Sequence, residues 1–117
     1  MIYIVTSSRY KINRRKIRKE AQDILDAYEV SPDLILNIVF VGRNKMKTIS
    51  KKYKNEEVAL PVLSFDYSKE AQSDGKLMGE IVICYPQAIL LAAERERRVD
   101  ETITKLIRHG IENILNE

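Results

Sequence analysis

The residues best suited to chemistry lie in the segment RHGIENILNE, residues 108–117. His109 is the only histidine of the chain, and Asn113 follows it four residues later. On a helix, residues with this spacing stack one turn apart and differ by about 40° around the axis. Zinc enzymes with an HExxH motif use the same spacing to direct two side chains at one metal ion. The spacing therefore indicates a metal site, and the residue types decide whether it is complete.

The residue types do not complete a zinc site. Zinc sites in proteins use at least three side-chain ligands, and the neutral amide oxygen of Asn113 binds zinc more weakly than an imidazole does. The single cysteine, Cys84, follows a run of β-branched residues and is expected to be a buried structural thiol. From the local residues alone, His109 is predicted to be a surface histidine of an ordinary helix.

Basic side chains are concentrated in the N-terminal half of the chain. Residues 1–60 contain 13 Lys and Arg against 7 Asp and Glu, whereas residues 61–117 contain 7 against 10. Clusters of this kind bind polyanions by releasing counterions, and RNA is the commonest cytoplasmic polyanion. The alternative is that these side chains only keep helix faces solvated. The candidate RNA-binding residues are Arg14, Arg15, Arg18, Lys51 and Lys54.

Length and composition limit the class of protein. A chain of 117 residues with 44% hydrophobic residues is expected to form one domain, residues 1–117. It contains no apolar run near the roughly 18 residues that span a bilayer. Its N-terminus places apolar residues before basic ones, the reverse of a signal peptide. With one cysteine and no disulfide, the chain is predicted to be cytoplasmic and not to associate with a membrane.

Four strands and four helices are expected, in the order β-α-β-α-β-β-α-α. The expected strands are residues 2–5, 34–41, 61–65 and 79–85, and the second reads as buried on both faces. The expected helices begin at Asn13, Asn44, Pro86 and Asp100, with the third continuing to about Arg98. This order predicts an α+β fold, with helices packed on a small mixed four-stranded sheet.

Three stretches together resemble the signatures of the YbeY family of bacterial rRNA maturation endoribonucleases. They are YKNEEVALPVLSF (53–65), GEIVIC (79–84) and LIRHGIENILNE (106–117). The family signatures are a Y-R-G…P-T-D/N-V-L-S-F segment, a G-D-I/L-V-I strand and a helix ending in H-G-x-x-H-L-x-G-x-D-H. The resemblance covers essentially the whole chain. It implies a YbeY-like metallohydrolase fold, a zinc ion held by three histidines, and a basic groove for single-stranded RNA.

Residue by residue, the resemblance leaves the metal motif incomplete. His109 matches the first zinc ligand, Asn113 occupies the position of the second, and the third would lie two residues after Glu117. Lys54 stands where the family has arginine, so it is the candidate catalytic residue, without the bidentate fork of a guanidinium. Glu112 lies about 60° around the helix from His109, and Glu117 lies at a fraying end. Zinc binding by the monomer is therefore expected to be weak or absent.

The resemblance leaves several functions open. The first is RNA binding, directed at ribosomal RNA or the small ribosomal subunit, without the zinc chemistry of the family. The second is metal-dependent RNA cleavage at a site completed by an unusual ligand, a second copy or an RNA phosphate. The third is a metal-free scaffold that binds the ribosome or a ribosome-associated protein. A truncated copy of a longer sequence would also explain the missing third histidine, and the nucleotide sequence beyond Glu117 tests that explanation.

Overall fold

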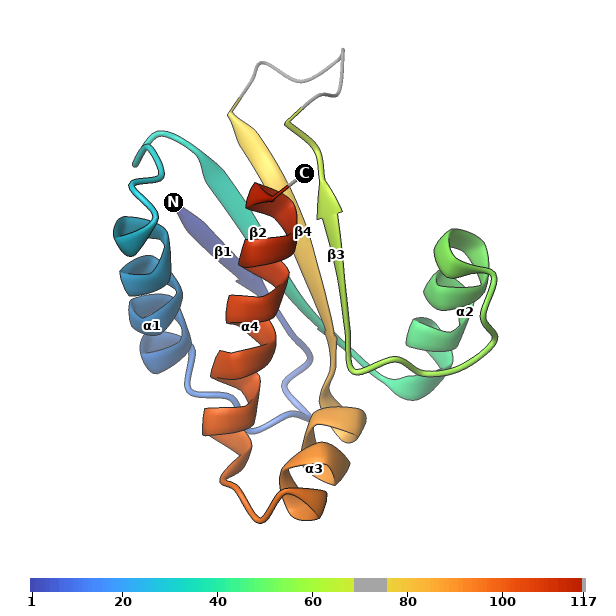
Figure 1. Ribbon diagram of the computed structural model, residues 1–117. Coiled ribbons are helices and arrows are strands. Elements are labelled where there is room, and N and C mark those ends of the chain that lie inside the picture. Colours follow the sequence, from blue (N-terminus) through green and yellow to red (C-terminus); the bar gives the residue numbers. More distant parts are fainter. Residues whose placement is uncertain (69–75, 117) are drawn as a thin grey trace.

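The computed structural model describes residues 1–68 and 76–116, and its elements follow the predicted order (Figure 1). The strands are β1 (Ile2–Val5), β2 (Ile35–Val41), β3 (Val62–Asp66) and β4 (Leu77–Cys84). The helices are α1 (Arg14–Ala27), α2 (Arg43–Lys54), α3 (Tyr85–Glu94) and α4 (Val99–Leu115). The predicted α+β fold, a mixed four-stranded sheet with four helices, is confirmed. Within the described ranges, no helix is long and apolar enough to cross a membrane.

The strand order in the sheet is β1-β2-β4-β3. β1, β2 and β4 run parallel, and β3 pairs antiparallel with β4 at one edge. Because side chains alternate along a strand, Ile81 and Ile83 of β4 face one side of the sheet, and Val82 and Cys84 face the other. α1 and α4 cover the first side, and α2 packs against part of the second (Figure 1). The two sides therefore carry different surfaces.

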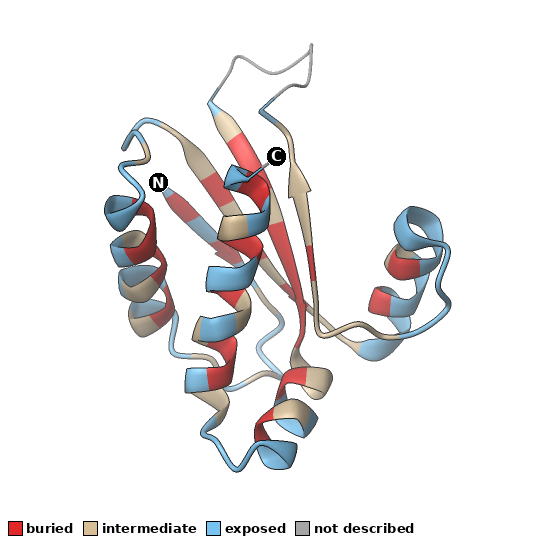
Figure 2. Ribbon diagram, viewed as in Figure 1, coloured by how far each residue is buried: buried red, intermediate tan, exposed pale blue. Residues whose placement is uncertain are grey.

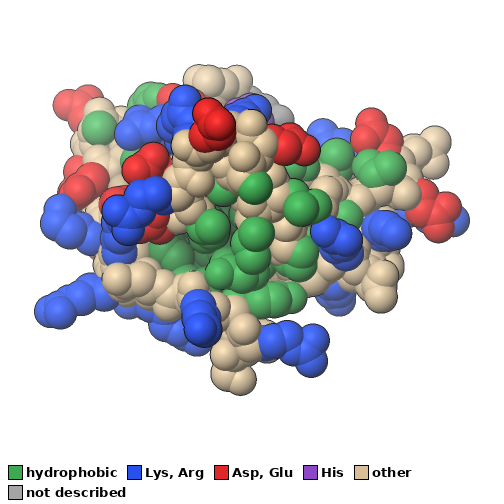
Figure 3. Space-filling model, turned by 90° about the horizontal axis from the view of Figure 1, so that it is seen from below, with side chains coloured by type: hydrophobic (Ala, Val, Ile, Leu, Met, Phe, Trp, Pro, Cys, Tyr) green, Lys and Arg blue, Asp and Glu red, His purple; other side chains and the backbone are tan. Residues whose placement is uncertain are grey.

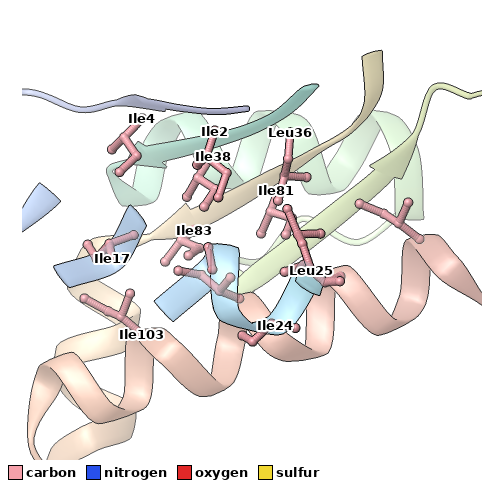
Figure 4. Packing of buried hydrophobic residues seen from close by; sticks show 14 of the residues in the cluster. Ile2, Ile4, Ile17, Ile24, Leu25, Leu36, Ile38, Ile81, Ile83 and Ile103 are labelled. Carbon is pink, nitrogen blue, oxygen red and sulfur yellow. The ribbon is translucent and has the colours of Figure 1, made fainter. Parts of the chain in front are cut away.

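The main core lies between the sheet and the helix pair α1 and α4. Isoleucine and leucine side chains from both layers interlock there (Figure 4). Ile38 and Ile81 are fully buried at its centre, and burial of such a side chain is worth roughly 1.5–3 kcal/mol. Gly110 lets α4 approach the sheet closely, since a Cβ at this position would lie 2.9 Å from Cδ1 of Ile81. This close approach fixes which flank of α4 faces outward.

The second side of the sheet is covered less completely. Its core cluster consists of Met46, Leu63, Val82 and Cys84. α2 buries only Met46 and Ser50, so most of this helix is exposed (Figure 2). The prediction that the second strand is buried on both faces is therefore wrong, because alternate residues of β2 on the α2 side are only half-buried. The cause is the small area that α2 covers.

Two predicted helix starts have different outcomes. Asn13 is the N-cap of α1, and its Oδ1 accepts a hydrogen bond from the N–H of Lys16 at 3.1 Å, as its residue type predicts. Asn44 does not cap α2, because the N-cap is Gly42 and Asn44 lies inside the first turn. Gly42 follows β2 directly, so α2 begins at Arg43, one residue before Asn44.

α3 ends at Glu94, four residues before the predicted end near Arg98. Glu96 adopts a left-handed conformation with φ of 51°, and the N–H of Arg97 donates to the carbonyl of Ala92 at 2.9 Å. This hydrogen-bond pattern is a Schellman motif, which ends helices by satisfying their last carbonyls. The motif leaves a short turn that carries several arginines between α3 and α4.

Candidate functional site around His109

His109 and Asn113 lie side by side on the outward flank of α4. Both side chains are exposed, while Gly110 and Ile111 face the sheet. Nδ2 of Asn113 lies 3.2 Å from Nε2 of His109. When Asn113 donates this hydrogen bond, Nε2 accepts it, and the imidazole proton resides on Nδ1. The predicted one-turn stacking of the two residues is confirmed, and the amide occupies the lone pair that a metal ion would take.

The carboxylate of Glu112 and the thiol of Cys84 are not placed to join His109 in a metal site. The hydroxyl of Tyr28 on α1 donates a hydrogen bond to the carboxylate of Glu112, and this bond raises the pKa of Tyr28. Cys84 is buried in the cluster on the α2 side of the sheet, where burial raises the pKa of its thiol. Glu117 lies outside the described residues.

These donors do not fit a zinc ion. Across residues 1–68 and 76–116, no group of three His, Cys, Asp or Glu side chains is placed to hold a metal. A zinc site requires three protein ligands of this kind. The single imidazole of His109, hydrogen-bonded to the amide of Asn113, is a polar surface group.

A groove with a volume of about 390 Å³ lies beside His109, between the start of β3 and the helices α3 and α4. Its apolar lining residues are Pro61, Val62, Leu91 and Leu106. Its cationic or protonatable lining residues are Arg95, Arg97, Lys105 and His109. In the part of the chain that the structure describes, none of these four groups forms an ion pair with a carboxylate. The groove therefore presents unneutralised positive charge above an apolar floor.

The family model described as Endoribonuclease YbeY matches residues 3–115 of the chain. The chain belongs to the YbeY family.

Curated YbeY relatives match at low identity. Endoribonuclease YbeY of Thermodesulfovibrio yellowstonii is 28% identical over 82 residues, which cover 70% of this chain and 52% of the relative. Its counterpart in Dehalococcoides mccartyi is 26% identical over 117 residues, covering 89% of this chain and 73% of the relative. The chain thus spans about half the length of the first of these relatives.

A solved structure shares the fold. The solution structure of TM1509 from Thermotoga maritima superposes with a TM-score of 0.66 and 18% sequence identity, covering 95% of this chain and 69% of the other. At this identity, the likeness establishes the arrangement of strands and helices.

Lys54, the candidate catalytic residue predicted from the resemblance, is the last residue of α2. It is exposed and does not line the groove beside His109, which α2 does not reach. The Leu60-Pro61 pair that replaces the polar pair of the signature does reach the groove, through Pro61. The structure therefore separates Lys54 from His109 and places an apolar residue near the histidine.

The predicted RNA-binding residues lie on two helices that pack on opposite sides of the sheet. On α1, Arg14 Nη1 donates to the carbonyl of Ile4 at 3.0 Å, and Arg18 Nε donates to the carbonyl of Ile2 at 3.4 Å. These two arginines therefore also hold the edge strand β1. On α2, Lys51 pairs with Glu57 at 3.9 Å, and both side chains are exposed. The other two residues, Arg15 and Lys54, are exposed.

The groove cations were missed because they come from the half of the chain with net negative charge. Two signals in the sequence point to them. Lys105, His109 and Asn113 recur at intervals of four and so share one helix flank. The run ERERR contains Arg95 and Arg97, and the end of α3 falls inside it.

A further surface lies at the lower end of the molecule in Figure 1, where β2 and β4 end and α2 and α3 begin. Seen from below, apolar side chains gather at the centre of this end, with both basic and acidic side chains around them (Figure 3). Tyr10 and Tyr85 stack with ring centroids 4.7 Å apart, and Ile89 and Leu90 of α3 are exposed. This end is separate from the groove beside His109, whose lining includes none of these four residues.

Proposed function

We propose that this chain binds single-stranded segments of ribosomal RNA and that the RNA backbone lies in the groove beside His109. The observation that carries the proposal is the presence of Arg95, Arg97 and Lys105 in one groove without carboxylate partners. Cations of this kind attract phosphates, and an apolar floor accommodates sugars and bases. Membership of a family named for an endoribonuclease supports RNA as the ligand. The proposal places the protein in the cytoplasm, in contact with the small ribosomal subunit.

Under this proposal, binding is separate from zinc-dependent cleavage. The donors around His109 do not fit zinc, because Asn113 hydrogen-bonds Nε2 and Glu112 bonds Tyr28. His109 remains useful for RNA binding as an exposed ring that can form hydrogen bonds. The groove therefore holds RNA through side chains of α3, α4 and the turn between them.

Salt dependence of RNA affinity tests the proposal. A labelled single-stranded oligonucleotide from ribosomal RNA is titrated with the protein over a series of salt concentrations. The triple variant Arg95→Ala, Arg97→Ala, Lys105→Ala is expected to lose affinity and to reduce the salt slope by about one for each phosphate contact removed. No binding by the wild-type chain at low salt, or a slope near zero, contradicts the proposal.

A matched triple variant shows which surface carries the RNA. This control also removes three positive charges, through Arg14→Ala, Arg15→Ala and Lys54→Ala. These residues lie on α1 and α2, where the sequence predicted RNA binding. The groove variant is expected to lose more affinity than this control. A larger loss of affinity in the control would indicate that RNA binds α1 and α2, and it would contradict binding in the groove.

The second candidate is the reaction for which the YbeY family is named, cleavage of RNA with a metal ion. The match of His109 to the first ligand of the family motif supports it. Metal analysis of the purified chain and a cleavage assay with and without a chelator test this candidate. Chelator-sensitive cleavage that is lost in His109→Ala supports it, whereas cleavage unchanged in His109→Ala rules this mechanism out.

A further inference from the structure

A hollow on the other side of the sheet carries the residue types that bind nucleobases. It has a volume of about 320 Å³ and lies between α2 and strands β3 and β4. Six of its lining residues are Tyr53, Phe65, Tyr67, Lys45, Lys52 and Glu80. We propose that this hollow binds one unpaired base of a single-stranded RNA. The choice of RNA rests on the proposed function, but the hollow shares no lining residue with the groove beside His109.

The aromatic rings offer faces on which a base can stack. Phe65 of β3 and Tyr67, the residue directly after this strand, have ring planes 11° apart and centroids separated by 6.3 Å. Tyr53 of α2 meets Phe65 edge to face, with centroids 4.9 Å apart. The Tyr53 side chain is 55% exposed, so its ring is open to a ligand. Proteins that bind single strands use such rings because every base has a π face.

The charge around the hollow is complementary to a phosphate backbone. The sequence of α2, RNKMKTISKKYK, contains six Lys and Arg and no acidic residue. Lys45 and Lys52 line the hollow, and Lys52 Nζ lies 5.2 Å from the centroid of the Tyr53 ring. Within the described part of the chain, the only ion pair formed by α2 joins Lys51 to Glu57. The other cations of this helix are therefore available to phosphates on either side of a stacked base.

A polar pair supplies contacts for the edge of the base. Glu80 on β4 lines the hollow and lies opposite Asn37 of β2 in the sheet. Partial burial raises the pKa of Glu80, and the hydrogen bond with Asn37 opposes this shift. A carboxylate accepts hydrogen bonds from an exocyclic amino group such as N4 of cytosine, whereas uracil carries a carbonyl oxygen at that position. The hollow is therefore expected to prefer cytidine to uridine.

Mononucleotide titrations followed by amide NMR resonances of α2 and β3 test the site without an RNA backbone. CMP is expected to shift the resonances of residues lining the hollow more than UMP does at equal concentration. Glu80→Gln is expected to bring the two responses close together, because a neutral amide can both donate and accept. Shifts confined to residues outside the hollow overturn the site. Equal responses to CMP and UMP in the wild-type chain overturn the preference for cytidine.

RNA affinity of ring variants tests the same site with a cytidine-rich single strand. The double variant Tyr53→Leu, Tyr67→Leu keeps apolar side chains but removes the ring faces, and it is expected to bind about 10-fold more weakly. Its salt slope should stay at the wild-type value, because no charge changes. Tyr3→Leu is the control, since Tyr3 is exposed on β1 and does not line the hollow. Circular dichroism and thermal unfolding confirm that each variant folds.

The outcomes separate this proposal from the proposed function. If the ring variants bind like the wild type while the groove triple variant loses affinity, the hollow has no role and the function stands. If CMP binds the hollow but no RNA binds, the proposed function fails and the base site remains. If a peptide shifts the lining residues and neither nucleotide does, the hollow is a protein-binding site and the proposal is overturned.

Discussion

Nδ2 of Asn113 lies 3.2 Å from Nε2 of His109, so the amide and the imidazole form a hydrogen-bonded pair one helical turn apart. The backbone of α4 holds the two side chains one turn apart on one flank. The spacing suited to two metal ligands is present, but one of the two side chains is an amide.

Replacement of Asn113 with histidine is expected to create a two-imidazole site at i and i+4. Zn²⁺ or Ni²⁺ should then bind at least about 10-fold more tightly than to the wild type and raise the unfolding temperature by mass action. Asn113→Ala is the control, because it removes the amide without adding a ligand. An equal thermal response to metal in all three proteins contradicts this expectation.

Gly110→Ala is expected to destabilise the fold by about 1–2 kcal/mol. The new Cβ would lie 2.9 Å from both Cδ1 and Cγ1 of Ile81, and overpacking of this kind costs about 1–3 kcal/mol, partly offset by the higher helix propensity of alanine. Urea denaturation measures the change. Ile81→Val removes Cδ1 and should make the double variant more stable than the sum of the two single effects predicts. Strict additivity would show that the two residues do not clash.

Ser50→Ala is expected to raise stability by about 1 kcal/mol. The Ser50 hydroxyl is buried, and it has no hydrogen-bond partner in residues 1–68 and 76–116. Removing an unpaired buried hydroxyl relieves a desolvation cost. Thr102→Val is the matched variant, because the buried Thr102 hydroxyl does donate, to the carbonyl of Arg98 at 3.1 Å. Thr102→Val should therefore lower stability, and a loss of stability in Ser50→Ala would reveal a partner for that hydroxyl.

The ion pair between Lys16 and Asp100 should make the packing of α1 on α4 depend on pH. Nζ of Lys16 lies 2.5 Å from Oδ2 of Asp100, and this hydrogen bond lowers the pKa of Asp100 below its ordinary value of 3.8. Its contribution is complete above that ordinary value and disappears as the pH falls through the lowered pKa.

Thermal unfolding of Asp100→Asn as a function of pH measures this effect. The variant is expected to be less stable than the wild type near pH 7, and this deficit should be smaller near pH 2. The control is Asp23→Asn, which removes an exposed pair within α1 and should have a smaller effect. If Asp100→Asn lowers thermal stability equally at both pH values, the loss comes from packing rather than from charge.

Glu80 should show a pH dependence of the opposite sign. Burial raises its pKa above the ordinary value of 4.5, so the folded state favours the neutral acid. Its contribution to stability therefore falls as the pH rises from below 4.5 through the raised pKa. Glu80→Gln is expected to be more stable than the wild type near neutral pH, and this advantage should shrink under acidic conditions. An advantage that grows toward low pH would contradict the raised pKa.

Local sequence signals predicted much of the fold. Asn13 caps α1 through the hydrogen bond that its residue type predicts. The spacing of His109 and Asn113 predicted their contact, because the period of a helix fixes neighbours one turn apart. Asn44 was misplaced because Gly42 and Asn44 both suit an N-cap, and the end of β2 decides between them.

Both proposed RNA surfaces depend on contacts between residues far apart in the sequence. The groove forms only when α3 and α4 pack beside the start of β3, which brings Arg95 and Lys105 close to Pro61. The hollow exists because β4 lies between β2 and β3 in the sheet, which pairs Glu80 with Phe65 on one side and Asn37 on the other. Periodicity and composition do not specify these pairings, so the sequence alone did not reveal either surface.

β3 is an edge strand, and it contributes Val62 to the groove and Phe65 to the hollow on its other side. An RNA chain that used both surfaces would have to bend sharply around β3. Its backbone would lie in the groove beside His109, and a single base would lie in the hollow on the other side of the sheet. A stiff double helix cannot follow that path. The edge of the sheet would then select single-stranded over double-stranded RNA, because only a flexible strand can bend around β3.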